Sequence, residues 1–129
     1  MRLRSASAIV SRVGRTVLIV DDHPAFRSAA RALLQAAGFD VVGDAADGLS
    51  ALEAVSRLLP EIVLLDIQLP DLDGFSVAKQ LASGTAPPAI VLTSSRSVAS
   101  LRWRLTANPA WSFIPKHELS AEALAAALG

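Results

Sequence analysis

Runs of apolar residues alternate with segments of helical periodicity along the chain. The first run, residues 16–20, reads T-V-L-I-V without polar alternation, which is typical of a strand that is covered on both faces. Pro24 then suits the first turn of a helix, and apolar residues recur at helical spacing until Gly38 supplies a stop. The pattern predicts a strand, an acidic turn and a helix.

This unit recurs four more times. Further apolar runs predict strands at residues 41–45, 62–65, 89–92 and 111–114. A helical pattern follows each of these runs, the last of them opened by Ser120 and Glu122. Strict alternation implies parallel strands joined by right-handed crossovers, so the carboxyl ends of all strands lie at one edge of the sheet. We therefore predict an α/β fold with one parallel sheet.

Five polar side chains follow the predicted strands and should meet at that edge, where open α/β sheets bind ligands. They are Asp21, Asp22, Asp66, Thr93 and Lys116. Three carboxylates held together repel one another, which favours a hard divalent cation. Mg²⁺ fits better than Ca²⁺, because the aspartate spacing of calcium loops is missing. A carboxylate can also attack phosphorus where cations offset the charge of the transferring group.

Composition narrows the functional classes. The 129 residues are 52% hydrophobic and 19% charged, which is enough for one core and short for two. Twelve basic and twelve acidic side chains cancel, which argues against a DNA-binding body. The chain has no cysteine, and this excludes a disulfide framework and any thiolate metal site. No apolar run approaches the ~20 residues of a membrane span, so we expect a cytoplasmic protein.

The first 14 residues differ from the rest. They carry Arg2, Arg4 and Arg12 without an acid, but their apolar stretch is too short and too rich in serine for a secretory signal. We expect residues 1–14 to be a flexible tail and residues 15–129 to be the folded domain.

Four segments carry a resemblance to a known family. They are V-L-I-V-D-D-H-P, L-L-D-I-Q-L-P-D-L-D-G, I-V-L-T-S and F-I-P-K. In this order they resemble the motifs of two-component response-regulator receiver domains, across residues 16–128. The first and last look most like the NarL/FixJ subgroup, whose members usually attach a helix-turn-helix effector, and we expect any such effector to lie outside these 129 residues. The resemblance implies a flavodoxin-like (βα)5 fold, a doubly wound sheet of strand order 2-1-3-4-5.

The resemblance implies roles for the acidic residues. Asp66 resembles the phospho-acceptor, Asp22 the direct metal ligand, and Asp21 a neighbour that reaches the metal through water. Gln68 would ligate the metal by its backbone carbonyl. The implied cofactor is Mg²⁺, with Mn²⁺ as a substitute.

It also implies how phosphorylation is relayed. Thr93 resembles the switch hydroxyl, Lys116 the lysine that pairs with the phosphate, and Phe113 the aromatic switch, although Phe113 lacks the hydroxyl of the commoner tyrosine. Gln68 and Ser95 correspond to the positions that tune the phosphoryl lifetime. The relay would end on the surface formed by the fourth helix, the fifth strand and the last helix.

The implied function is a phospho-acceptor switch and not a turnover enzyme. The expected partners are a sensor histidine kinase or a phosphotransfer protein, and a second copy in a homodimer. DNA would be contacted only through an effector domain that this chain does not carry, and no membrane contact is expected. Trp103 lies opposite the apolar face of the fourth predicted helix, and we expect it to contact a partner or a second subunit.

Other interpretations stay open. Asp22 could cap the helix that begins at Pro24, and Thr93 could simply end a strand. His23 adjoins the acidic pair, but we do not expect it to bind metal because no second histidine lies at ligand spacing. A haloacid-dehalogenase-type phosphatase also forms an aspartyl phosphate, but it needs a D-x-D pair after the first strand. A pseudo-receiver that acts as an interaction module is favoured by the atypical segment N-P-A-W-S at residues 108–112 and opposed by the five site residues.

Overall fold

A five-stranded parallel sheet lies at the centre of the structure. The computed structural model describes residues 15–96 and 111–129. The strands are β1 (Thr16–Val20), β2 (Asp40–Ala45), β3 (Ile62–Asp66), β4 (Ala89–Ser94) and β5 (Ser112–Pro115). They lie in the order β2-β1-β3-β4-β5, and every neighbouring pair is parallel. The predicted fold class and strand order are confirmed.

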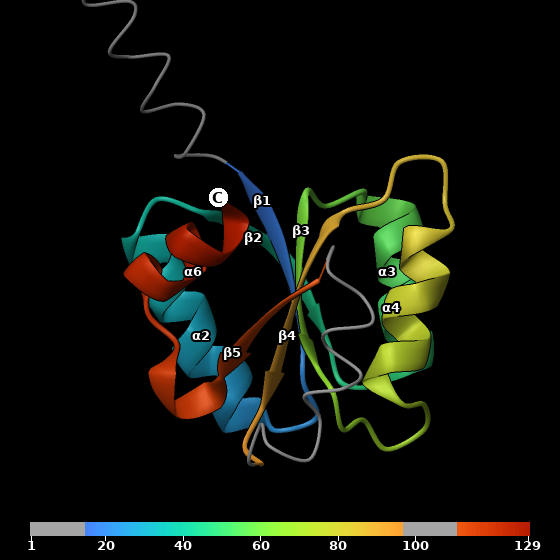
Figure 1. The fold of residues 1–129 in the computed structure, drawn as a ribbon, viewed down its shortest axis with the longest axis horizontal. Helices are drawn as coiled ribbons and strands as arrows, with labels where there is room; N and C mark the ends of the chain where they lie inside the picture. Colours follow the sequence, from blue (N-terminus) through green and yellow to red (C-terminus); the bar gives the residue numbers. More distant parts are fainter. Residues whose placement is uncertain (1–14, 97–110) are drawn as a thin grey trace, which may run out of the picture.

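Helices cover both faces of this sheet. They are α2 (Pro24–Ala36), α3 (Gly48–Leu58), α4 (Gly74–Ala82) and α6 (Ala121–Leu128), with a short 3-10 helix, η2 (Lys116–Glu118), between β5 and α6. Figure 1 shows α2 and α6 on one side of the sheet and α3 and α4 on the other. The helix predicted between β4 and β5 lies outside the described residues. Within residues 15–96 and 111–129, no helix is long and apolar enough to cross a membrane.

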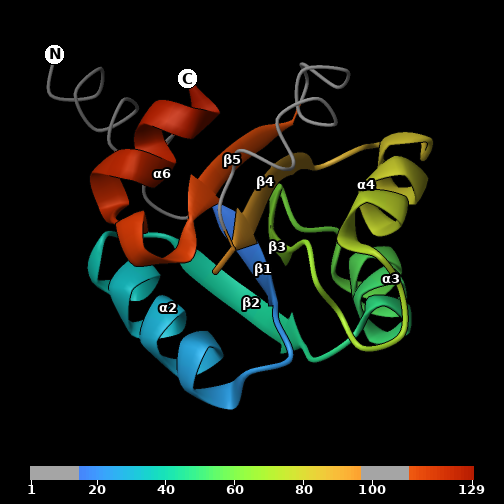
Figure 2. The same ribbon diagram turned by 60° about the horizontal axis from the view of Figure 1, so that its bottom comes forward.

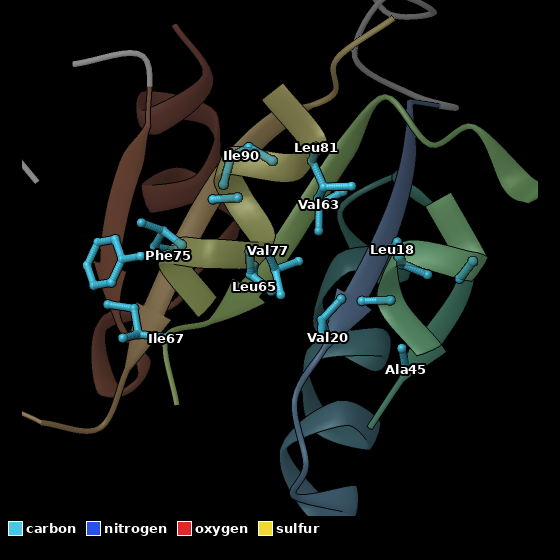
Figure 3. Packing of buried hydrophobic residues seen from close by; sticks show 14 residues of the cluster. Leu18, Val20, Ala45, Val63, Leu65, Ile67, Phe75, Val77, Leu81 and Ile90 are labelled. Carbon is cyan, nitrogen blue, oxygen red and sulfur yellow. The ribbon is translucent and has the colours of Figure 1, made fainter. Parts of the chain in front are cut away.

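The side chains of β1 alternate between two apolar layers. Leu18 and Val20 belong to the layer under α3 and α4, whereas Val17 and Ile19 belong to the layer under α2 and α6. All four are at most 1% exposed, as expected of a strand without polar alternation. Figure 3 shows the first layer, in which Val77 and Leu81 of α4 lie near Leu65 and Val63 of β3, while Leu18 and Val20 of β1 lie on the side of α3. Because both faces are covered, polar side chains of the central strands reach solvent only at the strand ends.

Two helix ends follow the predicted signals. Gly38, two residues beyond the end of α2, has a φ of 98°, and its N–H donates to the carbonyl of Gln35. This left-handed glycine is a frequent way to end a helix. At the start of α6, the Ser120 side chain accepts the N–H of Ala123. Both the glycine stop and the serine cap are confirmed.

Asp22 does not cap the start of α2, contrary to one interpretation of the sequence. The N-cap residue of α2 is His23, and that residue makes no side-chain capping hydrogen bond. The capping role considered for Asp22 is therefore wrong. Pro24 at the first helical position has no N–H to satisfy, which explains why this helix start needs less capping.

Candidate functional site

The five predicted site residues come from four strands whose carboxyl ends share one edge of the sheet, which Figure 2 turns toward the viewer. Asp21 and Asp22 follow β1, and Asp66 is the last residue of β3. Thr93 lies in β4 and pairs in register with Asp66. Lys116 directly follows β5. The parallel topology therefore brings together residues that lie up to 95 positions apart in the sequence (116 − 21).

An acidic cluster forms the centre of the site. Asp21 is fully buried and Asp66 is 2% exposed, whereas the side chain of Asp22 is 36% exposed. One ligand atom from each of Asp21, Asp22, His23 and Asp66 lies within 4.8 Å of the others. Two of the carboxylates thus face inward and one borders solvent, which leaves the cluster accessible from outside.

His23 contacts this cluster although the sequence argued against it as a ligand. Its Nδ1 lies 3.1 Å from one carboxylate oxygen of Asp21 and 3.1 Å from one of Asp22. The His23 backbone N–H also donates to Asp21 at 2.9 Å. Since the ring is 67% exposed, it can turn away from the carboxylates at little cost. His23 adjoins the acidic pair in the sequence, and the lack of a second histidine at ligand spacing was the reason for leaving it out of the expected ligands.

Lys116 supplies the positive charge of the site. Its Nζ lies 2.6 Å from Asp21 Oδ2 and 3.3 Å from Asp66 Oδ2, and its side chain is only 13% exposed. Burial alone would lower the pKa of Lys116, but the hydrogen bond to Asp21 and the charges of Asp66 and Asp21 outweigh it and raise that pKa. The Nζ also lies 4.8 Å from the centre of the Phe26 ring, within cation–π range. The ammonium is therefore held charged between two buried carboxylates.

Asp66 is a carboxylate in an unfavourable environment. Burial raises its pKa above the usual 3.8, and the charge of Asp21 raises it further, while the Gln68 N–H and Lys116 act in the opposite direction. The Gln68 N–H donates to Asp66 Oδ1 at 2.9 Å, and Lys116 approaches the other oxygen, Oδ2. The two oxygens of Asp66 thus have different partners, and the net negative charge is incompletely compensated.

Thr93 pairs in register with Asp66, and Phe113 lies on the next strand, β5, in register with Leu92. Thr93 is 1% exposed, and its Oγ1 finds no hydrogen-bond partner among the described residues. A buried hydroxyl without a partner is costly, so this oxygen marks a place where an additional acceptor would be stabilised. Phe113 is half-buried and packs against the apolar layer under α3 and α4.

The remaining predicted residues fall into two groups. Gln68 and Ser95 lie beside the site, after β3 and β4, and both are exposed. Trp103 lies outside the described residues, as does most of the segment 108–112. Sequence reasoning also missed Arg27 of α2, whose Nη1 donates to the Asp21 carbonyl at 2.7 Å and so ties α2 to the end of β1.

The donor set fits a small, hard cation. All the acidic ligands are carboxylate oxygens, which Mg²⁺ prefers, and Mg²⁺ needs only one or two of them because it keeps several waters. Burial first, and then the charge of Asp21, raise the pKa of Asp66, and a bound cation would offset both effects. The residues present therefore fit a magnesium ion.

Comparison with known proteins gives the same family at the level of sequence and of structure. The model of the response regulator receiver domain family matches residues 17–128. The chain is 35% identical over 111 residues to BvgA of Bordetella pertussis, named as a transcription regulator of virulence factors, and this match covers 86% of the chain and 53% of the relative. It is 48% identical over 80 residues to a protein-glutamate methylesterase/protein-glutamine glutaminase of Myxococcus xanthus, covering 61% and 23%.

A solved structure shows the same fold. The signal receiver domain of NarL from Mycobacterium tuberculosis superposes with a TM-score of 0.75 at 32% identity, and the match covers 91% of this chain and 98% of that domain. The chain spans about half the length of the first curated relatives that it matches. The similarity to BvgA and NarL agrees with the subgroup that the sequence resembles.

Proposed function

Because this chain belongs to the response regulator receiver domain family, we propose that it is a phospho-acceptor switch in which Asp66 takes a phosphoryl group from a histidine kinase or a phosphotransfer protein. One observation carries the proposal. Asp66 is a buried carboxylate of the acidic cluster that lies 3.3 Å from Lys116 and, unlike Asp21, pairs in register with Thr93, whose hydroxyl has no partner among the described residues. A nucleophilic carboxylate needs positive charge close to the transferring group, and Asp66 has it.

In the proposed reaction, an oxygen of Asp66 attacks phosphorus, a P–O bond forms, and the P–N bond to the histidine of the donor breaks. The Gln68 N–H holds Oδ1, which leaves Oδ2 on the side of Lys116. Lys116 then pairs with the negative phosphoryl oxygens while it stays charged. Asp21, Asp22, Asp66 and the Gln68 carbonyl would hold Mg²⁺, which when bound supplies charge that offsets the transferring group.

Thr93 is the residue through which we propose that the new group is sensed. Its buried hydroxyl has no partner among the described residues and lies in register with Asp66. A phosphoryl oxygen offers the missing acceptor, so the hydroxyl would turn toward it and vacate space for the Phe113 ring. Phosphorylation would thereby change the surface that includes β5. Gln68 and Ser95, exposed at the rim, would set how easily water reaches the phosphoryl group.

The proposed organisation is a tail at residues 1–14 and a receiver domain at residues 15–129. Receiver domains of transcription regulators act together with other domains and are generally not turnover enzymes themselves. BvgA is named as a transcription regulator and the Myxococcus xanthus protein as a methylesterase. We propose that the output of this switch is exerted through another domain or a partner, including a second copy of the chain.

The test is phosphorylation by acetyl phosphate with Mg²⁺, followed by intact mass and phosphate release. We expect one acid-stable, base-labile phosphoryl group on the wild type and none on Asp66→Asn. Asp40→Asn, an exposed acid at the start of β2, is the matched control and should be modified like the wild type. Absence of the adduct would support the pseudo-receiver, and rapid multiple-turnover phosphate release would support the phosphatase.

A further inference from the structure

Asp71 connects two parts of the molecule that are distant in sequence. It lies in the loop between β3 and α4, which directly follows Asp66. Its Oδ1 accepts the N–H of Gly48 at 2.7 Å, and its Oδ2 accepts the N–H of Leu49 at 3.0 Å. Oδ1 also accepts the N–H of the adjacent Leu72 at 2.8 Å. The hydrogen bond from Gly48, with those from Leu49 and Leu72, lowers the pKa of Asp71, so its carboxylate stays ionised at neutral pH.

Two aspartates from different segments accept the N–H groups at the start of α3. The first N–H groups of a helix have no partner within the helix. Asp71 takes those of Gly48 and Leu49, and the Asp47 side chain takes that of Ser50 at 2.8 Å. Both acids also suit the positive end of the helix dipole. Only Asp71 belongs to the loop after β3, whereas Asp47 belongs to the segment that leads into α3 itself.

The contact between this loop and α3 is tight on the apolar side as well. A Cβ added to Gly48 would lie 2.8 Å from Leu72 Cβ and 2.8 Å from its Cδ1, so a side chain there would push the loop away. Glycine is therefore required for close approach. The loop is anchored twice to the helix, by the Asp71 carboxylate and by Leu72.

The base of the loop is held against the site. Gln68 pairs with Asp73 in an antiparallel bridge, and the Gly74 N–H donates to the Ile67 carbonyl at 2.8 Å. At the same place the Gln68 N–H donates to Asp66. Residues 68–73 thus form a closed loop whose base is at the acidic cluster and whose tip is at α3.

We propose that Asp71 is a positioning residue: its clamp on the N-terminus of α3 fixes the loop that carries Gln68, and so sets the geometry of the cation site. Asp71 touches neither Asp66 nor the cation ligands, so it acts through the backbone of residues 68–71. This inference rests on the proposed function only in taking Gln68 as a member of the cation site. The loss of outer partners that orient ligands typically weakens metal binding 10- to 100-fold.

The test compares Asp71→Ala with Asp47→Ala in the full chain. Both remove one cap from the same helix, but only the first frees the loop. Mg²⁺ affinity is measured from amide chemical shifts during titration, and the contact itself from hydrogen exchange of the Gly48, Leu49 and Ser50 amides. Asp71→Ala should speed exchange at Gly48 and Leu49 and weaken Mg²⁺ binding on the order of tenfold. Asp47→Ala should speed exchange at Ser50 and leave Mg²⁺ affinity unchanged.

Asp71→Asn serves as the conservative variant. Its amide oxygen can accept from Gly48 while the amide nitrogen cannot accept from Leu49, so Mg²⁺ affinity should fall between those of the wild type and Asp71→Ala. Unchanged affinity in Asp71→Ala, or an equal loss in Asp47→Ala, would overturn the inference. If the wild type binds Mg²⁺ but forms no aspartyl phosphate while Asp71→Ala still weakens Mg²⁺, the proposed function fails and the inference stands. A wild type that binds no Mg²⁺ would overturn both.

Discussion

Replacing Lys116 by methionine tests whether its ammonium stabilises the fold by compensating the charges of the buried carboxylates Asp21 and Asp66. The substitution keeps an unbranched side chain of similar length and removes the ammonium that lies 2.6 Å from Asp21 and 3.3 Å from Asp66. Both carboxylates are at most 3% exposed. Without metal they would remain buried beside each other with no cation of the described chain between them.

The expected loss of folding stability follows from the distances between the Lys116 ammonium and the two carboxylates. At an effective dielectric constant of ~20, the attraction is about 6 kcal/mol across 2.6 Å and about 5 kcal/mol across 3.3 Å. Withdrawing the ammonium from water offsets most of this gross attraction. Removing one partner of a buried ion pair typically costs about 3–5 kcal/mol. Because Lys116 lies at the edge of the sheet, we expect about 3 kcal/mol, measured by urea denaturation at neutral pH without Mg²⁺.

The loss should depend on pH with a defined sign. The pKa of Asp66 is raised above 3.8 in the folded protein, so above that value the native state holds more protons than the unfolded state and stability falls as pH rises. Removing Lys116 raises the native pKa further and widens this window. The deficit of Lys116→Met should therefore be smaller at mildly acidic pH, where a larger fraction of folded Asp66 is protonated. Mg²⁺ added at neutral pH should also reduce the deficit.

The control is the other lysine of the chain. Lys79 is exposed in the last turn of α4, and Lys79→Met should change stability by no more than about 0.5 kcal/mol at any pH. A deficit of Lys116→Met that is the same at both pH values and with or without Mg²⁺ would refute the electrostatic reasoning, because loss of packing alone has no such dependence.

Three further predictions concern neighbouring residues. Metal-free Asp66→Asn should be more stable than the wild type at neutral pH in urea denaturation, because the substitution removes a buried carboxylate whose pKa is raised by burial and by Asp21; a lower stability would contradict this. Thr93→Val should leave stability unchanged or raise it by up to about 1 kcal/mol, since it removes a buried hydroxyl without a described partner. In the same variant, the shift of the Phe113 NMR resonances on phosphorylation should disappear. An intact shift would exclude the relay from Thr93 to Phe113. Gly74→Ala should cost about 1–3 kcal/mol in thermal or urea unfolding, because its Cβ would meet the backbone of Asp66 and Ile67; a neutral effect would show that this approach is not tight.

The arrangement of the sheet was predictable because the signals are local. An apolar run without polar alternation is typical of a strand covered on both faces, and β3 is accordingly buried along its whole length and β1 from Val17 to Val20. Parallel strands then place whatever follows them at one edge, which is why Asp21, Asp66 and Lys116 were predicted to meet. Strand limits were less certain, and β5 begins and ends one residue later than the apolar pattern indicated.

The contacts between loops could not be predicted in the same way. Asp71 and Gly48 are 23 positions apart, and the sequence around Asp71 indicates only a turn, because aspartate beside proline and glycine has local reasons to be there. Likewise, the sequence indicated that Lys116 belongs to the site but not that it lies nearer to Asp21 than to Asp66. Such details depend on where the backbone of a second segment lies, and no periodicity reports this.

The site of the unmodified protein contains two unmet requirements, and a phosphoryl group with its cation would meet both. Asp66 carries a charge that burial and Asp21 oppose, and Thr93 buries a hydroxyl with no described acceptor. Each costs stability in the unmodified state, so natural selection for folding alone would favour asparagine and valine at these positions. Under the proposed function the cost has a use. Phosphorylation would replace the carboxylate charge with that of a phosphoryl group, which Lys116 and a bound cation would offset, and it would supply the acceptor. The conformation in which Thr93 turns inward would then be selectively stabilised, and a small chemical change could shift a two-state packing equilibrium.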